Sequence, residues 1–343
     1  MVISATGQLA PDEDARYAML LERMRRIRSL QDGTLHMEPV GIHFHVLTKH
    51  DSLLRFWLVE QNDTDTGVIQ SEIDLDDPLA LQEAYTQAML LPLAWTPDPR
   101  AVYMAGVGGG RVALALHHFF PEVHLYCSEL EPEIVEIAQT YFGLPQGGRV
   151  HVAIEDGREY LARRTRRFDM ILLDVFLDNG YSPYRMATVE FFSLCRDRLT
   201  PEGALSINLL ANDPFVERKL QSLAAVFPAV YLFTCRPVDS DENLVALASM
   251  RDDLSGAALM ERAAAVETGH ALPYPLAAYA AMLTPVPRGG AAPLTDDHVP
   301  AGYFDSLPSF DTPFSQVAPE RPCPCGSGRK YAACHGRGRP RLV

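Results

Sequence analysis

The feature that most constrains the fold is an alternation of apolar runs and helix-like segments that starts near residue 100. Parallel strands buried on both faces read as near-continuous apolar runs, and crossover helices cover those faces. The apolar runs are AVYMAGV, VHLYCSEL, RVHVAIED, FDMILLDVF and ALSINLL. The alternation therefore predicts an α/β fold with a doubly wound, mostly parallel sheet, which QSLAAVF, VYLFTC and NLVALASM are expected to complete.

The residues before this alternation follow a different pattern. Residues 14–29 place apolar side chains at helical spacing, and IHFHVL, LLRFWLVE and TGVIQSEIDL then alternate with a period of two. This pattern predicts a helix followed by a small antiparallel β-domain. His43 and His45 share one face of its first strand. Because no third ligand is nearby in the sequence, we expect a packed or solvated strand face there and no metal site.

Composition changes again near residue 285. The stretch that follows is rich in Pro, Gly and Asp and has little periodicity, which is typical of a chain that wraps over a surface or links domains. The expected parts are an N-terminal helix with the β-domain (1–90), the α/β domain (91–285), the linker or wrapping segment (286–320) and a terminal module (321–343).

Charge and hydropathy exclude several classes of protein. The 30 basic and 44 acidic residues give a net charge of −14, which suits a cationic substrate better than general binding of nucleic acid. No apolar run reaches the roughly 18 to 20 residues that span a bilayer, and the N-terminus has no basic region followed by an apolar one. We therefore expect a cytoplasmic protein with no membrane partner, in which Cys127, Cys195 and Cys235 are buried, reduced thiols.

Four successive strand ends of the predicted sheet carry glycine or an acidic residue. In order they are a glycine loop with Gly106, Gly108 and Gly110, then Glu129, then Asp156 with Gly157, and finally Asp174. Ligands of open α/β sheets bind outside the carboxyl ends of the strands, so these residues outline one crevice. A carboxylate at Glu129 can accept hydrogen bonds from both hydroxyls of a ribose, and one at Asp156 can accept from an adenine amine.

The pattern of the glycine loop bears on which nucleotide fits the crevice. The distance along the chain from the loop to Glu129 suits a dinucleotide equally well. The loop, however, reads G-x-G-G-G, and an Asp-Gly pair at the third strand would have little to do with a pyrophosphate. These two features favour an adenosyl sulfonium ligand. The structural alternative is that the glycines make a tight turn and the carboxylates cap helices.

Several of these segments together resemble a known family. The runs GVGGG, CSELEPEIVEIAQTYFG, VAIEDGREYL, FDMILLDVF and LTPEGALSINL are similar to the spermidine synthase family of polyamine aminopropyltransferases. GVIQS, EAYTQAML and PLTDDHVP extend the resemblance over roughly residues 50 to 300. It implies a Rossmann-like, class I methyltransferase-like fold, decarboxylated S-adenosylmethionine as cosubstrate, a polyamine-type amine as acceptor, and assembly into a homo-oligomer.

The resemblance also implies roles for individual residues. Glu129 would hold the ribose, Asp156 with Gly157 the adenine, and Gln70 and the glycine loop the rest of the donor. Asp174 would act at the reacting centre, as base or as the group that orients the acceptor for in-line displacement. Tyr85 and Asp178 would contact the acceptor amine.

Three positions depart from the family pattern. Gly109 stands where the loop usually has an aspartate that holds the donor's amine, and Gln87 replaces a glutamate that contacts the diamine. The pair Asp174 and Asp178 is spaced one residue further apart than usual. Two other functions are therefore open: a methyltransferase whose loop amides receive the carboxylate of intact S-adenosylmethionine, and a non-catalytic nucleoside-binding protein.

The C-terminal module has its own motif, CPCGSGRKYAACH. Three thiolates and one imidazole form a complete tetrahedral zinc set, which is typical of a structural site; the expected ligands are Cys323, Cys325, Cys334 and His335. The string resembles the SEC-C motif, a zinc-binding tail, and the resemblance implies contact with a partner protein or the ribosome. Residues 321–343 contain basic and no acidic side chains, which favours docking to an acidic partner or RNA, or a simply solvated terminus.

Overall fold

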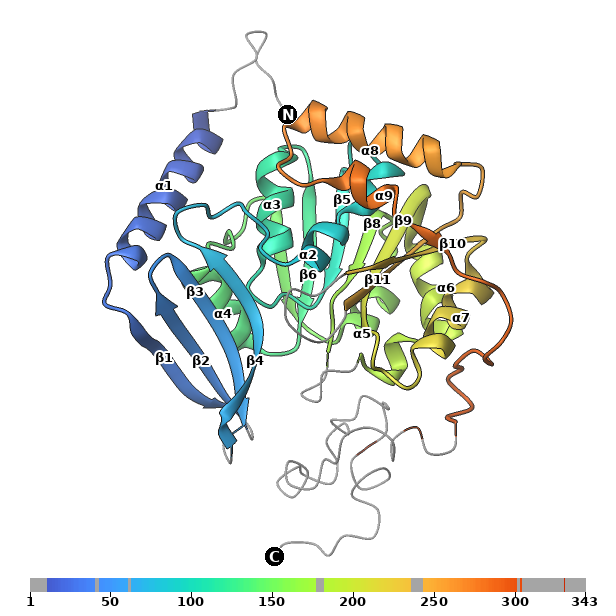
Figure 1. Ribbon diagram of the computed structural model, residues 1–343, viewed down its shortest axis with the longest axis horizontal. Coiled ribbons are helices and arrows are strands. Elements are labelled where there is room, and N and C mark those ends of the chain that lie inside the picture. The colour runs from blue at the N-terminus through green and yellow to red at the C-terminus, as the bar shows by residue number, and fades with distance from the viewer. Residues whose placement is uncertain are drawn as a thin grey trace, which may run out of the picture.

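The computed structural model describes residues 11–40, 43–60, 63–176, 182–235 and 243–300, together with Tyr303 and Lys330. Within these residues the chain forms two sheets (Figure 1). The smaller is the antiparallel sheet β1-β2-β3-β4, and the larger has the order β12-β10-β11-β9-β8-β5-β6-β7. Strands β9, β8, β5, β6 and β7 pair in parallel, while β10, β11 and β12 pair antiparallel. The predicted α/β class with a mostly parallel sheet is confirmed.

The larger sheet is built from strands near the predicted apolar runs. They are β5 (Ala101–Ala105), β6 (His124–Glu129), β7 (Val150–Ile154), β8 (Phe168–Leu173), β9 (Leu199–Leu210), β10 (Ala229–Thr234), β11 (Asn243–Ser249) and β12 (Thr284–Pro285). The run QSLAAVF, expected as part of the sheet, instead lies mostly in helix α7 (Val216–Val226). Leu220, Leu223 and Ala224 in and around it are buried, and their spacing of three and one is helical, so the prediction of a strand there was wrong.

Helices cover both faces of the larger sheet. They are α2 (Ala84–Ala88), η1 (Leu91–Ala94), α3 (Arg111–Phe119), α4 (Pro132–Tyr141), α5 (Gly157–Ala162), η2 (Tyr184–Met186), α6 (Val189–Arg198), α8 (Gly256–His270) and α9 (Leu276–Ala280), besides α7. Along β5, Val102 and Met104 join a core with residues of α3 and α8, whereas Tyr103 and Ala105 join a second core with residues of α6 and α7. Because alternate residues enter opposite cores, the strand is apolar on both faces.

The smaller sheet packs beside the larger one, where Figure 1 shows it in blue next to α4. Its strands and the preceding helix are α1 (Pro11–Arg28), β1 (Gly33–Val40), β2 (His43–His50), β3 (Leu53–Glu60) and β4 (Asp63–Asp74). A third core joins Met24 of α1 and Phe56 of β3 to Ile137 of α4. His43 and His45 are buried, and the His45 ring packs edge-on against Phe56, so they form the expected packed strand face.

The segment after β12 lies against the α/β domain as far as residue 300. Leu294 is fully buried, and its backbone N–H and carbonyl bond to Ser222 of α7 and Val189 of α6. The Arg158 guanidinium donates to the Asp296 carboxylate at 2.8 Å. Among the helices that the structure describes, none is both long and apolar enough to cross a membrane.

Candidate functional site

The glycine loop between β5 and α3 depends on glycine for its shape. Gly106, Gly108 and Gly110 have φ values of +80°, +50° and +67°, a region that side chains other than glycine rarely adopt. A Cβ atom on Gly106 would overlap the backbone carbonyl oxygen of Asp174. The loop thus brings the end of β5 against the end of β8, as the crevice requires.

The backbone N–H groups of this loop donate within the protein. The Val107 N–H donates to Glu129 Oε2 at 2.9 Å, and the Gly110 N–H donates to the Val107 carbonyl at 2.8 Å. The Gly109 N–H donates to the Ser71 hydroxyl at 2.7 Å, which ties β4 to the loop. In this conformation the amides of Val107, Gly109 and Gly110 already have acceptors within the protein, so they give no support to the idea that they receive the carboxylate of a ligand.

Ser71 also explains the missing aspartate of the loop. A Cβ on Gly109 would lie 2.7 Å from Ser71 Cβ and 3.0 Å from Phe142 Cδ1. Real Cβ atoms do not approach other atoms so closely, so no larger side chain fits without a shift of β4. Gln70, the neighbour of Ser71, is half-buried, and its carbonyl faces Gly108, where a Cβ would lie 3.7 Å away.

Glu129 stands at the end of β6 with both carboxylate oxygens in use. Oε2 accepts from Val107, and Oε1 accepts from the N–H groups of Leu130 at 2.8 Å and Glu131 at 3.3 Å. Burial raises the pKa of this carboxyl, while the backbone N–H groups oppose the rise. A carboxylate oxygen accepts more than one hydrogen bond, so this fixed group retains capacity for ribose hydroxyls.

Two apolar side chains beside Glu129 are exposed. Leu130 is 61% exposed and Ile154, at the end of β7, is 52% exposed. Ile154 pairs in register with Glu129, and Leu130 follows Glu129 in the chain, so both residues lie near the end of β6. Sequence reasoning missed both residues, although the position of each at the end of a strand was a usable signal. A flat apolar ring would cover them.

Asp156 and Gly157 have structural roles at the start of α5. The Asp156 carboxylate accepts from the Glu159 N–H at 2.9 Å and so caps the helix. Gly157 is buried, and a Cβ on it would lie 3.0 Å from both the Ala105 Cβ and the Tyr103 hydroxyl oxygen. The structure shows that Asp156 caps α5, the structural alternative that the sequence left open. The predicted contacts of Asp156 and Gly157 with adenine stay a prediction.

Asp174, the residue expected at the reacting centre, follows β8. Its Oδ1 accepts from the Asn208 amide at 2.9 Å, and burial raises its pKa to about 6 although this hydrogen bond opposes the rise. Tyr85 of α2 lies near enough for the Asp174 charge to affect it. Burial first, and then the Asp174 and Glu83 charges, hold the Tyr85 pKa well above its usual value, so its hydroxyl remains a donor.

Gln87, the neutral replacement for a family glutamate, is held by the protein on both sides of its amide. Its Nε2 donates to the Leu81 carbonyl at 2.6 Å, and its Oε1 accepts from the Tyr279 hydroxyl at 3.0 Å. A glutamate could not donate to the Leu81 carbonyl. The glutamine therefore suits both hydrogen bonds, and it carries no negative charge.

The other predicted residues fall outside the part of the chain that the structure describes. These are Asp178, Cys323, Cys325, Cys334 and His335. Over the described residues, no group of three or more His, Cys, Asp and Glu side chains is placed to hold a metal ion.

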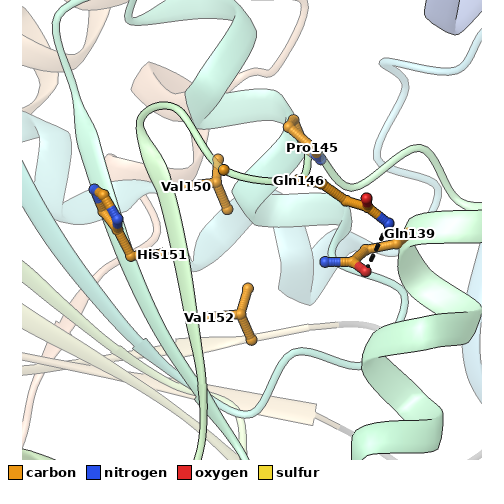
Figure 2. Close-up of a pocket in the computed structure, with 7 residues that line it drawn as sticks. Gln139, Pro145, Gln146, Val150, His151 and Val152 are labelled. Atoms are coloured by element: carbon orange, nitrogen blue, oxygen red, sulfur yellow. Dashed lines mark hydrogen bonds between the residues drawn. The ribbon is translucent and has the colours of Figure 1, made fainter.

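A separate hollow lies at the start of β7, at the end of the strand opposite to Ile154. Figure 2 shows Val150, His151 and Val152 along the strand on one side, and Gln146 and Gln139 on the other. The Gln146 amide donates to Gln139 of α4 at 2.9 Å. Val150 begins β7, whereas the crevice lies where the strands end. The hollow is thus distinct from the crevice.

Comparison with known proteins identifies two segments. Residues 83–240 match the spermine/spermidine synthase domain, and residues 322–337 match the SEC-C motif. The first segment holds the glycine loop, Glu129, Asp156 and Asp174, and the second holds the four expected zinc ligands. Both family resemblances inferred from the sequence are confirmed, the first of them over residues 83–240.

Relatives of the chain divide between two activities. The polyamine aminopropyltransferase of Chromobacterium violaceum is 31% identical over 160 residues, which are 46% of this chain and 61% of that enzyme. The human methyltransferase-like protein 13, solved in complex with SAH, is 28% identical with a TM-score of 0.50, covering 55% of this chain and 93% of that one. A probable spermidine synthase from Corynebacterium glutamicum, 18% identical with a TM-score of 0.57, covers 77% and 98% and shows the shared fold.

Proposed function

We propose that this chain, which carries a spermine/spermidine synthase domain and a SEC-C motif, transfers an aminopropyl group from decarboxylated S-adenosylmethionine to a polyamine-type amine. The observation that carries the proposal is the place of Asp174. Its carboxylate follows β8, its backbone carbonyl lies against Gly106 of the glycine loop, and its charge reaches Tyr85. An acidic group thus stands directly beside the predicted nucleoside site.

The nucleoside side of the crevice fits an adenosyl sulfonium, whose part in the chemistry is to supply a carbon with a good leaving group. Glu129 would accept from the ribose hydroxyls, because its carboxylate is already oriented by three backbone N–H groups. Leu130 and Ile154 would cover the faces of the adenine. Gly106 and Gly108 would allow the ligand to approach the backbone, since neither carries a side chain.

Asp174 would act on the acceptor. The attacking nitrogen needs a free lone pair, yet an alkyl amine is a cation at neutral pH. As the nitrogen bonds to carbon and the carbon–sulfur bond breaks, one proton must leave the nitrogen. Near neutral pH a carboxyl with a pKa of about 6 is mostly ionised, so it attracts and orients the cation and can take up that proton.

A second candidate is methyl transfer from intact S-adenosylmethionine. Ser71 and Phe142 leave no room for an aspartate in place of Gly109. The loop therefore lacks the carboxylate that would hold the amine of the decarboxylated donor, and this absence favours methyl transfer. The similarity to human methyltransferase-like protein 13 supports it as well. Both candidates use the same nucleoside site and differ in which carbon is attacked.

The released nucleoside distinguishes the two candidates. The protein is incubated with either donor and a panel of amines, and the products are identified by mass spectrometry. Aminopropyl transfer releases methylthioadenosine, and methyl transfer releases S-adenosylhomocysteine. Formation of the first, lost in Asp174→Asn, is the result we expect. S-adenosylhomocysteine alone would replace the proposal by the second candidate, and neither product would contradict both.

We also propose that the C-terminal motif binds one structural zinc ion and serves docking to a protein or ribosomal partner. The support is the donor set, because three thiolates and one imidazole close a tetrahedral site with no position for a substrate.

Cys127, Cys195 and Cys235 are free and buried, which fits the reducing cytoplasm that we propose as the location.

A further inference from the structure

A chain of two hydrogen bonds runs from Asp174, after β8, across β9 to β11. The Asn208 Nδ2 of β9 donates to Asp174 Oδ1 at 2.9 Å, and the Asn243 Nδ2 of β11 donates to Asn208 Oδ1 at 2.9 Å. Strands β11, β9 and β8 are adjacent in the sheet. Asn208 is 1% exposed, so water does not replace these partners. Neither asparagine was singled out from the sequence.

The chemistry of the three groups fixes the direction of the chain. An ionised carboxylate only accepts hydrogen bonds, so Asn208 must present its NH2 group to Asp174. Its oxygen then points away and needs a donor, which Asn243 supplies. Rotating the Asn208 amide by half a turn would place two oxygen atoms against each other at Asp174. Asn243 opposes that rotation, because it would lose its acceptor.

The backbone of Asp174 is held independently of this chain. Its N–H donates to the Ala105 carbonyl at 2.9 Å, and its carbonyl lies against Gly106. What remains to be fixed is the carboxylate itself. Asn208 of β9 holds Oδ1, which leaves Oδ2 for the proposed crevice.

We propose that Asn208 is the positioning residue of Asp174, and that Asn243 acts through Asn208 by setting the orientation of its amide. The inference rests on the proposed function, because it explains how the carboxylate of Asp174, the proposed acceptor-binding group, is held in place. It predicts that a change at Asn243, which does not touch Asp174, alters how readily Asp174 ionises.

Other titratable groups near Asp174 come from α2 and the end of β10. Within the described part of the chain, Tyr85 is the group whose titration responds to the Asp174 charge, and Glu83 and Cys235 act on Tyr85 in turn. For Asp174, burial opposes ionisation and the Asn208 hydrogen bond favours it. Replacing the asparagines leaves Tyr85 and Glu83 unchanged, so a shift can be assigned to the chain.

The experiment follows the Asp174 carboxyl directly by ¹³C NMR titration of the full chain labelled at aspartate, with the signal assigned by its loss in Asp174→Asn. Asn208→Leu removes the donor and should raise the Asp174 pKa by about one unit. Asn243→Ala and Asn243→Leu, which add no charge, remove the donor to Asn208 and should each raise the pKa, by less than Asn208→Leu does. Ser206→Ala is the matched control.

That control removes a buried side chain on the same strand, whose hydroxyl donates to the Met89 carbonyl at 3.0 Å, and should leave the Asp174 pKa unchanged. An unchanged Asp174 pKa in Asn208→Leu, or in both Asn243→Ala and Asn243→Leu, would overturn the inference. If Asn208→Leu does not fold, the two Asn243 variants decide. The acidic limb of the pH–rate profile should move with the carboxyl pKa. A carboxyl that shifts as expected in a protein without transferase activity would refute the proposed function and leave the positioning chain standing.

Discussion

The two sides of the proposed crevice, the nucleoside side and the reacting side, are built in different ways. On the nucleoside side, the partners come from one strand and the next: Val107 and Glu129 are 22 residues apart, and Leu130 directly follows Glu129. On the reacting side, Asn208 reaches Asp174 over 34 residues, and Tyr279 reaches Gln87 over 192. The proposed nucleoside side therefore depends mainly on backbone groups of neighbouring strands, with Ser71 of the smaller sheet as a distant side-chain partner, 38 residues from Gly109. The reacting side depends on side chains that only the folded sheet brings together.

The largest effect is expected at Gly106, where both sides meet. Gly106→Ala would place a methyl group on the Asp174 carbonyl at a positive φ, and should lower the free energy of unfolding by about 3 kcal/mol. Gly147→Ala is the matched control, because Gly147 has φ +73° and no atom within 4 Å of its Cβ position. It should cost about 1 kcal/mol in urea denaturation. Equal losses of stability in the two variants would show that the contact between Gly106 and the Asp174 carbonyl does not limit the side chain at this position.

This difference in construction explains what the sequence could predict. The glycine loop and Glu129 were found because their positions at strand ends follow from the alternation of strands and helices. Ser71 lies in a different sheet, 38 residues from Gly109, so nothing in the loop reveals that it fills the space of the missing aspartate. Asn208 sits within an apolar run, and its partners could not be inferred before the strand order was known.

The incorrect prediction of a strand at QSLAAVF has a similar cause. QSLAAVF is a short apolar run, and short runs do not separate a buried helix from a buried strand by periodicity alone. The helical assignment follows only when Lys219 and Leu220 upstream are seen to be buried together with Leu223.

The next effect concerns the loop aspartate. Gly109→Asp should lower the free energy of unfolding by about 2 kcal/mol, because the new side chain meets Ser71 and Phe142. Adding Ser71→Gly should recover part of this loss, since it removes the nearer of the two contacts. Thermal denaturation of the two variants measures both. Full stability of Gly109→Asp alone would mean that Ser71 does not exclude an aspartate from the loop.

A smaller, pH-dependent effect is expected at Asp174. Because its pKa in the folded protein is raised from 3.8 to about 6, ionisation costs stability, and the cost appears as the pH rises through that value. Asp174→Asn should therefore raise the free energy of unfolding by about 1–2 kcal/mol at pH 8 and by nothing at pH 4. Chemical denaturation at the two pH values tests this. An equal gain in the free energy of unfolding at pH 4 and pH 8 would show that the ionisation of Asp174 is not its cause.

The smallest effect on the reaction is expected from the C-terminal module. Removal of residues 321–343 should change kcat/KM by less than about twofold, because a closed zinc site has no position for a substrate. Metal analysis should find about one zinc ion per full-length chain, lost in the truncated chain and in Cys323→Ser with Cys325→Ser. Zinc that survives these changes, or activity that disappears with the module, would contradict the separation of docking from catalysis.

The division of the crevice is tested most directly by a matched pair of carboxylate-to-amide variants. Calorimetric titration with methylthioadenosine measures nucleoside binding, and turnover is measured on the same preparations. Glu129→Gln should weaken binding about tenfold or more, since it removes an acceptor of charge-assisted hydrogen bonds. Asp174→Asn should bind within about threefold of the wild type and lose about 100-fold in turnover. Equal loss of binding in both variants, or no binding by the wild type, would contradict the account.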